Sequence, residues 1–266
     1  MEFTVLGSSG FIGTYLVNYL QSKNFSCNAP NLRKENIYKK SLGHVIYSVG
    51  ISNFLEDPYN AVEAHTCILN KILKNADFES FLYISSGRFY YNTKTASEDD
   101  NIEINPNDKN QLYNISKLLG ETICMASNKP NIKIVRPSNV TGVGTPKNLF
   151  IPSLIKDAIE TKKISLRSSL DSKRDFVSID DLVRILPEIA LKGTQKIYNV
   201  AMGENTSSRE IVNEISRITG CEIEVTKDAP EYSAPVISIE RIKNEFNFKP
   251  SSIMPLLEKM ILDYKN

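Results

Sequence analysis

The sequence has few of the residues that bind metals or form crosslinks. Its 266 residues include only two histidines and four cysteines, and no two cysteines form a C-x-x-C pair. We therefore predict no metal site. A chain of this length can bury enough apolar surface to fold without disulfides or metals. The isolated cysteines fit a reducing compartment, and we expect a cytoplasmic protein.

Long apolar runs and an excess of one charge are also missing. No apolar run approaches 18 residues, so we expect no membrane-spanning segment, and the first residues do not resemble a signal peptide. The 32 Lys and Arg residues balance 31 Asp and Glu residues. This balance argues against a dedicated nucleic-acid or acidic-membrane binder. The basic stretch Arg33–Lys40 is short and of mixed charge, as a solvated loop would be.

Short apolar runs alternate along the chain with segments of helical periodicity. Strands are expected at 2–6, 44–49, 81–84, 132–135 and 196–200, and helices at 11–20, 61–73, 112–125, about 153–162, 180–191, 208–219 and 252–264. This alternation predicts βαβ units and a parallel sheet. Asp180 and Ser208 are expected helix N-caps. Pro187 should kink or end the helix that contains it.

We therefore predict the α/β class, with a Rossmann doubly wound parallel sheet and a smaller C-terminal α/β substrate lobe. Residues 1–140 are expected to form the NAD(P)-binding domain, with parts of 174–202 returning to it. Residues 141–266 would form the smaller lobe over the carboxyl edge of the sheet. The Gly-, Pro- and Asn-containing segment 141–153 resembles a loop over a ligand.

A glycine-rich turn follows the first expected strand and opens the first expected helix. Gly7, Gly10 and Gly13 have the spacing G-x-x-G-x-x-G. The first glycine permits a tight turn, the second a close approach of pyrophosphate, and the third close packing of helix on strand. The helix N-terminus adds favourable partial charge. The turn thus predicts a dinucleotide site, and the alternative is a structural turn without a ligand.

Tyr113 and Lys117 are four residues apart on an expected helix, and therefore share one face. An ammonium group beside a phenol favours phenolate, so Tyr113 could exchange a proton with a substrate oxygen as hydride moves. Ser86 follows the expected strand 81–84, where a hydroxyl group could bind the same oxygen. Taken singly, each feature has another explanation. A tyrosine and a lysine four residues apart often occur by chance, and Ser86 could be an ordinary turn residue.

Together these motifs resemble the extended short-chain dehydrogenases, specifically the nucleotide-sugar epimerase/dehydratase/reductase family. The matching segments are 7–13, 84–86, 113–117, 136–140 and 173–182, in that order. The resemblance implies that Ser86, Tyr113 and Lys117 are the catalytic triad. It also implies cofactor contacts from Gly7, Gly10, Phe11, Ile12, Gly13, Asn31, Arg33, Gly50, Tyr113, Lys117 and Pro137. For the substrate it implies Ser86, Arg88, Asn139, Asn148, Leu149 and Arg174. Arg174 could instead form an ion pair with Asp171 or Asp175.

The sequence departs from the family pattern at several places. Residues 28–34 contain no acidic partner for the ribose 2′-hydroxyl and offer Arg33 and Lys34 instead. We therefore expect NADP in preference to NAD, although the two residues could belong to a solvated loop. Arg88 stands where dehydratases carry a carboxylate, so a 4,6-dehydratase is not expected. Arg88 could face the sugar or lie on the surface.

Two further departures concern a helix and a loop. His65 stands where the family usually has an asparagine that maintains a proton relay. It could relay protons itself, but we favour plain packing. The loop 226–235 lacks the arginine that often clamps the diphosphate, so the nucleotide is not predicted.

We favour a nucleotide-sugar ketoreductase in which NADPH reduces a keto carbon, C4 in our interpretation, for surface-polysaccharide precursors. An epimerase with tightly bound NAD is the alternative, and a non-catalytic dinucleotide-binding protein is the minor one. A homodimer through helices 61–73 and 112–125 is expected, although their apolar stripes could equally belong to the core.

Overall fold

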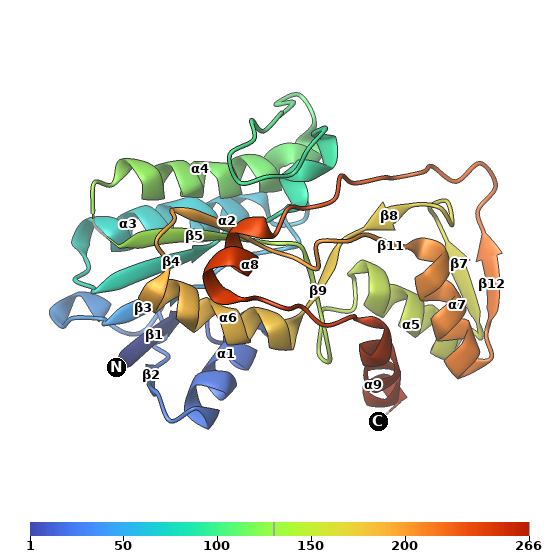
Figure 1. The fold of residues 1–266 in the computed structure, drawn as a ribbon, viewed down its shortest axis with the longest axis horizontal. Helices are drawn as coiled ribbons and strands as arrows, with labels where there is room; N and C mark the ends of the chain where they lie inside the picture. The colour runs from blue at the N-terminus through green and yellow to red at the C-terminus, as the bar shows by residue number, and fades with distance from the viewer. Residues whose placement is uncertain (130, 266) are drawn as a thin grey trace.

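A parallel sheet of six strands forms the centre of the molecule. The computed structural model describes residues 1–129 and 131–265, with the side chain of Asn92 excepted. The strand order is β10-β5-β4-β3-β1-β2, and every neighbouring pair is parallel (Figure 1). The strands are β1 (Glu2–Leu6), β2 (Ser26–Asn28), β3 (His44–Tyr47), β4 (Ser80–Ile84), β5 (Ile132–Pro137) and β10 (Ile197–Val200). The prediction of a Rossmann parallel sheet is confirmed.

Both faces of the sheet are buried. Successive side chains of a strand point to opposite faces, and the side chains on each face belong to a hydrophobic cluster. In β3, Val45 and Tyr47 belong to one hydrophobic cluster, and Ile46 belongs to another. In β4, Tyr83 belongs to the cluster of Val45 and Tyr47, and Leu82 belongs to the cluster of Ile46. This is why the strands read in the sequence as continuous apolar runs rather than as alternating ones.

Helices cover each face (Figure 1). On one side lie α1 (Phe11–Ser22) and α6 (Ile179–Lys192), and on the other lie α2 (Pro58–Val62), α3 (Ile68–Asn75) and α4 (Leu112–Ala126). The segment expected as one helix over 61–73 contains a π-helical turn, η2 (Glu63–Cys67), between α2 and α3. Such turns occur often at functional sites. Short 3₁₀ turns are η1 (Ile37–Lys39), η3 (Arg88–Asn92) and η4 (Lys109–Gln111).

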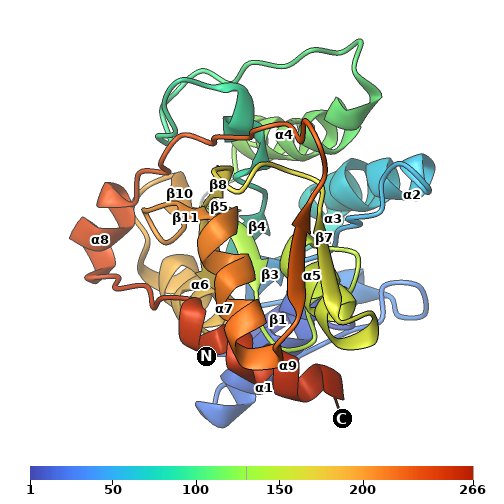
Figure 2. The same ribbon diagram turned by 90° about the vertical axis from the view of Figure 1, so that its right-hand side faces the viewer.

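A third hydrophobic cluster lies in the C-terminal part of the chain (Figure 2). It joins α5 (Phe150–Glu160), α7 (Ser208–Thr219) and α9 (Met254–Lys265) to the parallel pair β7 (Lys163–Leu166) and β12 (Glu222–Val225). Two further strand pairs lie between the clusters, and they are β6 (Asn139–Thr141) with β9 (Phe176–Ser178) and β8 (Lys173–Arg174) with β11 (Thr206–Ser207).

The domain limits stay a prediction, but the packing of the C-terminal part is more interwoven than expected. Helix α6 and strand β10 pack with the sheet. Helix α8 (Glu240–Phe246) also packs with the sheet. It contacts β10 and buries Ile242 in the cluster that contains Ile46 and Leu82. The segment 237–248 therefore packs with the central sheet, although the prediction gave it to the smaller lobe.

Two local expectations were wrong, and one of two alternatives for a third is excluded. Helix α6 is capped by Ser178, whose hydroxyl accepts a hydrogen bond from the Asp181 amide at 3.0 Å, and not by Asp180. Helix α7 is capped by Ser207, because Glu210 completes a capping box with it. Of the two effects expected of Pro187, it does not end helix α6, which continues to Lys192 because its apolar face is buried on both sides of the proline. The expected kink stays a prediction.

The loop expected over 141–153 is shorter than predicted, because α5 already begins at Phe150. Within the described residues, no helix has the length and apolar character that crossing a membrane requires.

Candidate active site

The glycine turn connects β1 to α1 as predicted. Gly7 has a φ of +91°, in the region that favours glycine, and its carbonyl accepts a hydrogen bond from the Gly10 amide at 3.1 Å. Gly10 is the N-cap of α1, without a side-chain cap. The first amide groups of α1, at Phe11 and Ile12, are therefore not covered by a capping side chain. A helix end of this kind suits a phosphate group.

The third glycine is required by packing. A Cβ atom at Gly13 would lie 2.1 Å from the carbonyl oxygen of Gly7, a clash that the backbone could not relieve. A Cβ at Gly7 would likewise lie 2.7 Å from the Val49 amide nitrogen, in the turn that follows β3. The turn thus brings α1 and the end of β3 together around bare backbone, which fits a dinucleotide pyrophosphate.

The predicted catalytic residues gather at the carboxyl end of β4. Ser86 lies two residues beyond this strand, and its hydroxyl accepts a hydrogen bond from the Arg88 amide at 3.1 Å. Tyr113 and Lys117 lie on α4. The Lys117 ammonium group donates a hydrogen bond to the carbonyl oxygen of Ile84 at 2.9 Å, so β4 holds both the serine and the lysine.

The electrostatic environment of Tyr113 differs from the expected one. Burial raises the pKa of the phenol, while a hydrogen bond with Ser86 and the positive charge of Arg88 act to lower it. The net shift is upward, so the expectation that Lys117 lowers this pKa is not met. Lys117 is itself buried, at 4% exposure. At neutral pH Tyr113 is a protonated phenol, which is the form that donates a proton.

Burial also lowers the pKa of Lys117 to about 7, against a smaller opposite effect of Glu121. The folded chain therefore binds this proton less readily than the unfolded chain between about pH 7 and the ordinary lysine value. In this window the unfolded state holds more protons, and stability rises with pH. Below pH 7 the full cost of burying the charge is present.

Replacing Lys117 with methionine should consequently stabilise the protein. We expect a gain of roughly 3 kcal/mol at pH 7, after allowance for the lost hydrogen bond to Ile84. The gain should shrink as the pH rises toward 10. Urea unfolding of both proteins at pH 6, 8 and 10 measures it. A wild type that is the more stable protein at pH 7, or a difference independent of pH, would contradict this account of the lysine.

His65 is fully buried in the π-helical turn and makes two hydrogen bonds. Its Nε2 atom accepts from the Ile51 amide at 3.2 Å, and its Nδ1 atom lies 2.8 Å from the Ser116 hydroxyl. The ring also packs edge-on against Tyr113, with 5.2 Å between ring centroids. Burial, then the charge of Lys117, lowers the pKa of His65 to about 3. A ring that stays neutral and fully bonded fits packing better than proton relay.

The histidine variant His65→Ala is therefore expected to lower turnover several-fold at most. It should also lower the free energy of unfolding by about 2 kcal/mol or more, because it leaves a cavity and unpaired polar groups. Steady-state kinetics and urea unfolding measure the two effects. Loss of nearly all turnover in a folded variant would contradict the packing interpretation.

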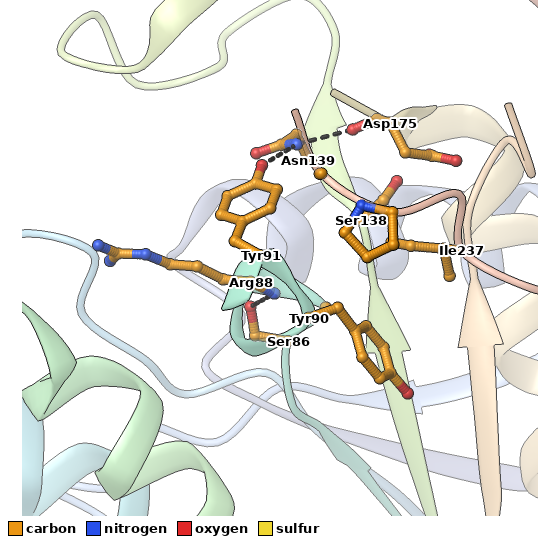
Figure 3. Close-up of a pocket in the computed structure, with 11 residues that line it drawn as sticks. Ser86, Arg88, Tyr90, Tyr91, Ser138, Asn139, Asp175 and Ile237 are labelled. Atoms are coloured by element: carbon orange, nitrogen blue, oxygen red, sulfur yellow. Dashed lines mark hydrogen bonds between the residues drawn. The ribbon is translucent and has the colours of Figure 1, made fainter. Parts of the chain in front are cut away.

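A pocket beside the triad contains three of the predicted substrate residues, Ser86, Arg88 and Asn139 (Figure 3). The Asn139 amide donates to the Tyr91 hydroxyl at 2.8 Å and to the Asp175 backbone oxygen at 2.7 Å. Both amide protons are thus engaged. Its side-chain oxygen remains the group that could accept a hydrogen bond from a ligand.

The pocket also has residues that the sequence analysis missed. Tyr91 was overlooked although it lies five residues beyond Ser86, and Asp175 although it follows Arg174. Residues 234, 235 and 237 line the pocket too, from the segment after β12. The loop 226–235 lacks an arginine but brings Ala234 and Pro235 to the site.

Arg174 has no ion-pair partner among the described residues, so the alternative of a pair with Asp171 or Asp175 is wrong. Asp171 pairs with Arg209 at 2.9 Å. The Asp175 carboxylate accepts from backbone amides 202 and 203, each at 2.8 Å. The Arg174 guanidinium instead stacks on Phe150, 4.3 Å from the ring centroid. This keeps it near the pocket with its hydrogen-bond donors unused.

The remaining predicted residues do not line this pocket. Asn148 and Leu149 are exposed, and Leu149 is the N-cap of α5. Gly50 follows β3, where a Cβ would lie 3.4 Å from both the His65 ring and the Lys117 ammonium. The Pro137 carbonyl accepts from the Gly87 amide at 2.7 Å.

The turn after β2 contains Asn31 and Arg33, both exposed. The Asn31 amide donates to the Glu35 carboxylate at 2.6 Å. Glu35 lies one position beyond the segment 28–34, which itself contains no acidic residue.

A sequence model described as the NAD dependent epimerase/dehydratase family matches residues 44–201. The chain belongs to this family. The resemblance noted in the sequence is thereby confirmed.

Among the relatives in this family is the GDP-6-deoxy-D-mannose reductase of Pseudomonas aeruginosa, 26% identical over 84% of this chain and 82% of the relative. A similar solved structure is RMD from Pseudomonas aeruginosa complexed with NADPH, with a TM-score of 0.80 and 21% identity. Another is MoeE5 in complex with UDP-glucose and NAD, with a TM-score of 0.83 and 18% identity. Each of the two alignments covers 100% of this chain and 99% of the solved chain. At such identities the structures show the shared fold.

Proposed function

We propose that this protein is a nucleotide-sugar ketoreductase, which reduces a keto carbon, C4 in our assignment, with a nicotinamide dinucleotide. The observation that carries the proposal is the placement of Ser86 and Tyr113 around Arg88 at the end of β4. The Arg88 amide donates to the Ser86 hydroxyl at 3.1 Å, and the Arg88 guanidinium lies 5.5 Å from the Tyr113 ring centroid. A serine and a protonated tyrosine placed in this way can bind a single carbonyl oxygen between them.

The reaction follows from these groups. A reduced nicotinamide dinucleotide bound at the glycine turn would supply the hydride for the new carbon–hydrogen bond. The Ser86 hydroxyl and the Tyr113 phenol hold the carbonyl oxygen and stabilise the charge that develops on it. The Tyr113 O–H bond breaks, its proton completes the alcohol, and the resulting phenolate regains a proton from solvent. With its pKa raised by burial, the Tyr113 phenol is protonated before the reaction, in the form that can donate a proton.

Dehydration of the sugar fits the pocket less well. Elimination of water needs a carboxylate near the sugar, and the side chain that follows Ser86-Gly87 is Arg88. The pocket's acidic residue, Asp175, is 2% exposed, and backbone amides occupy its carboxylate oxygens. The relative named a GDP-6-deoxy-D-mannose reductase supports reduction. We place the product in the synthesis of surface-polysaccharide precursors.

For the cofactor, we propose that the glycine turn holds the pyrophosphate and that Lys117 and Tyr113 approach the nicotinamide ribose. Arg33 is exposed in the turn after β2 and could contact a 2′-phosphate, which favours NADP. Glu35 in the same turn offers a carboxylate to an unmodified ribose, so the preference depends on which side chain faces the cofactor.

We also propose a homodimer, with α4 in the interface. Leu119 and Met125 expose 49% and 53% of their surface on this helix. Sedimentation of the purified protein measures the oligomeric state.

The test of the ketoreductase proposal is the cofactor content of freshly purified protein. The protein is denatured, and the supernatant is analysed for NAD, NADH and their phosphorylated forms. A protein without bound cofactor, stabilised against heat by NADPH more than by NADH, supports a reductase. Near-stoichiometric NAD would instead indicate an epimerase that recycles its hydride, and would contradict the proposal.

A further inference from the structure

Two arginines flank the pocket, and neither forms an ion pair among the residues that the structure describes. Arg174 lies on Phe150, and we assign it to the substrate diphosphate, as the family resemblance implies. Arg88 lies near the catalytic phenol. Burial raises the pKa of Tyr91, whereas the Asn139 hydrogen bond and then the charges of Arg174 and Arg88 act to lower it. Tyr91 therefore lies within the field of both arginines.

Arg88 is fixed relative to the reacting groups by three contacts. Its amide donates to the Ser86 hydroxyl at 3.1 Å. Its guanidinium lies 5.5 Å from the ring centroid of Tyr113 and 5.0 Å from that of Phe54. Figure 3 shows the side chain extending away from Tyr91 and Asn139. The two arginines therefore serve different parts of a bound molecule.

Arg174 is available for the diphosphate of a nucleotide sugar, which carries two negative charges. Arg88 is placed differently, because its side chain extends away from Tyr91 and Asn139 (Figure 3). Its guanidinium stands beside the phenol that touches the reacting carbon's oxygen, where the sugar must lie. A half-buried guanidinium with unused donors binds a carboxylate through two parallel hydrogen bonds more strongly than it binds hydroxyl groups.

We infer that Arg88 is the recognition site for an acidic substituent, a carboxylate in the simplest case, on the sugar of the substrate. The inference rests on the proposed function, because it takes the sugar to lie against Ser86 and Tyr113. It narrows the substrate class to nucleotide sugars that carry a second negative group besides the diphosphate.

Two other roles for Arg88 give different expectations. Asp108 is near enough for the charge of Arg88 to contribute, after its hydrogen bonds with Asn110, to lowering the pKa of that carboxyl. The two nevertheless form no ion pair. Alternatively, Arg88 could only hold the Tyr113 ring through its cation–π contact. In that case its removal would affect acidic and neutral substrates equally.

The test compares nucleotide sugars that differ in one group. UDP-glucuronate and UDP-glucose form one pair, and GDP-mannuronate and GDP-mannose form the other. Dissociation constants are measured by calorimetry on protein saturated with NADP⁺, and again with NAD⁺. In at least one pair, the wild type should bind the acidic sugar about ten- to hundredfold more tightly than the neutral one.

Two variants make the comparison specific. Arg88→Gln should remove the preference for the acidic sugar, and Arg88→Lys should keep part of it. Arg174→Gln is the matched control, and it should weaken both sugars of a pair by the same factor. Unfolding midpoints establish that each variant is folded.

Three results would overturn the inference. They are equal affinities within both pairs in the wild type, a preference that survives in Arg88→Gln, and binding of none of the four sugars. A failure of the proposed function is recognised separately, because it appears as an absence of hydride exchange and not as a change in this ratio.

Discussion

The variant Tyr113→Phe is expected to lose turnover by about 10²–10⁴-fold while it binds the dinucleotide within a few-fold of the wild-type affinity. Phenylalanine keeps the ring contacts with His65, Phe54 and Arg88 and removes only the hydroxyl group. Since that group is the proton donor of the proposal, chemistry should be lost and packing retained. Single-turnover kinetics and cofactor titration measure the two quantities.

Ser86→Ala is the companion variant, because it removes the other hydroxyl at the same substrate oxygen. Retained turnover in Tyr113→Phe would contradict the catalytic assignment and would favour a non-catalytic dinucleotide-binding protein. Loss of cofactor binding together with turnover would indicate that the tyrosine has a structural role instead.

The variant Arg136→Met should destabilise the protein by about 3–5 kcal/mol, because it leaves a buried carboxylate without its partner. Arg136 and Glu121 are 5% and 4% exposed, and their side chains meet at 2.7 Å between β5 and α4. The same guanidinium donates to the Tyr90 hydroxyl at 2.7 Å. Tyr90 lines the pocket, so the pair also fixes the turn that carries Arg88. Urea unfolding at pH 7 measures the loss.

The double variant Glu121→Leu/Arg136→Met is the control for this prediction. Replacing both charges by apolar groups removes the unpaired carboxylate, so the double variant should be clearly more stable than Arg136→Met alone. A double variant as unstable as the single one would show that the cost arises from lost packing and not from the buried charge.

Much of the fold could be predicted because local pattern and tertiary environment agree. Strands buried on both faces, such as β3 and β4, must be apolar throughout, and they are easily recognised. The glycine turn was recognisable because its spacing reflects a steric need that the structure makes explicit at Gly13. Helix starts were less certain, since either of two adjacent serines at 207 and 208 could cap α7, and only the reach of Glu210 decides between them.

The site was harder to predict where its properties arise from burial. The sequence places Tyr113 one helical turn from Lys117, but the pKa of each depends on how deeply α4 packs against β4. Burial in that packing raises the pKa of Tyr113 and lowers the pKa of Lys117. Tyr91 and Asp175 join the pocket through contacts between segments far apart in the chain. No spacing rule connects residues 91, 139 and 175.

The most direct measurement of the central claim follows a labelled hydride. The protein is incubated with NADPH carrying deuterium at C4 of the nicotinamide and, in turn, with keto nucleotide sugars, including the 4-keto form of GDP-6-deoxy-D-mannose. We expect mass spectrometry to find deuterium on the former keto carbon of one product, and Tyr113→Phe to abolish this transfer. Absence of deuterium from every sugar, or undiminished transfer by Tyr113→Phe, would contradict the account.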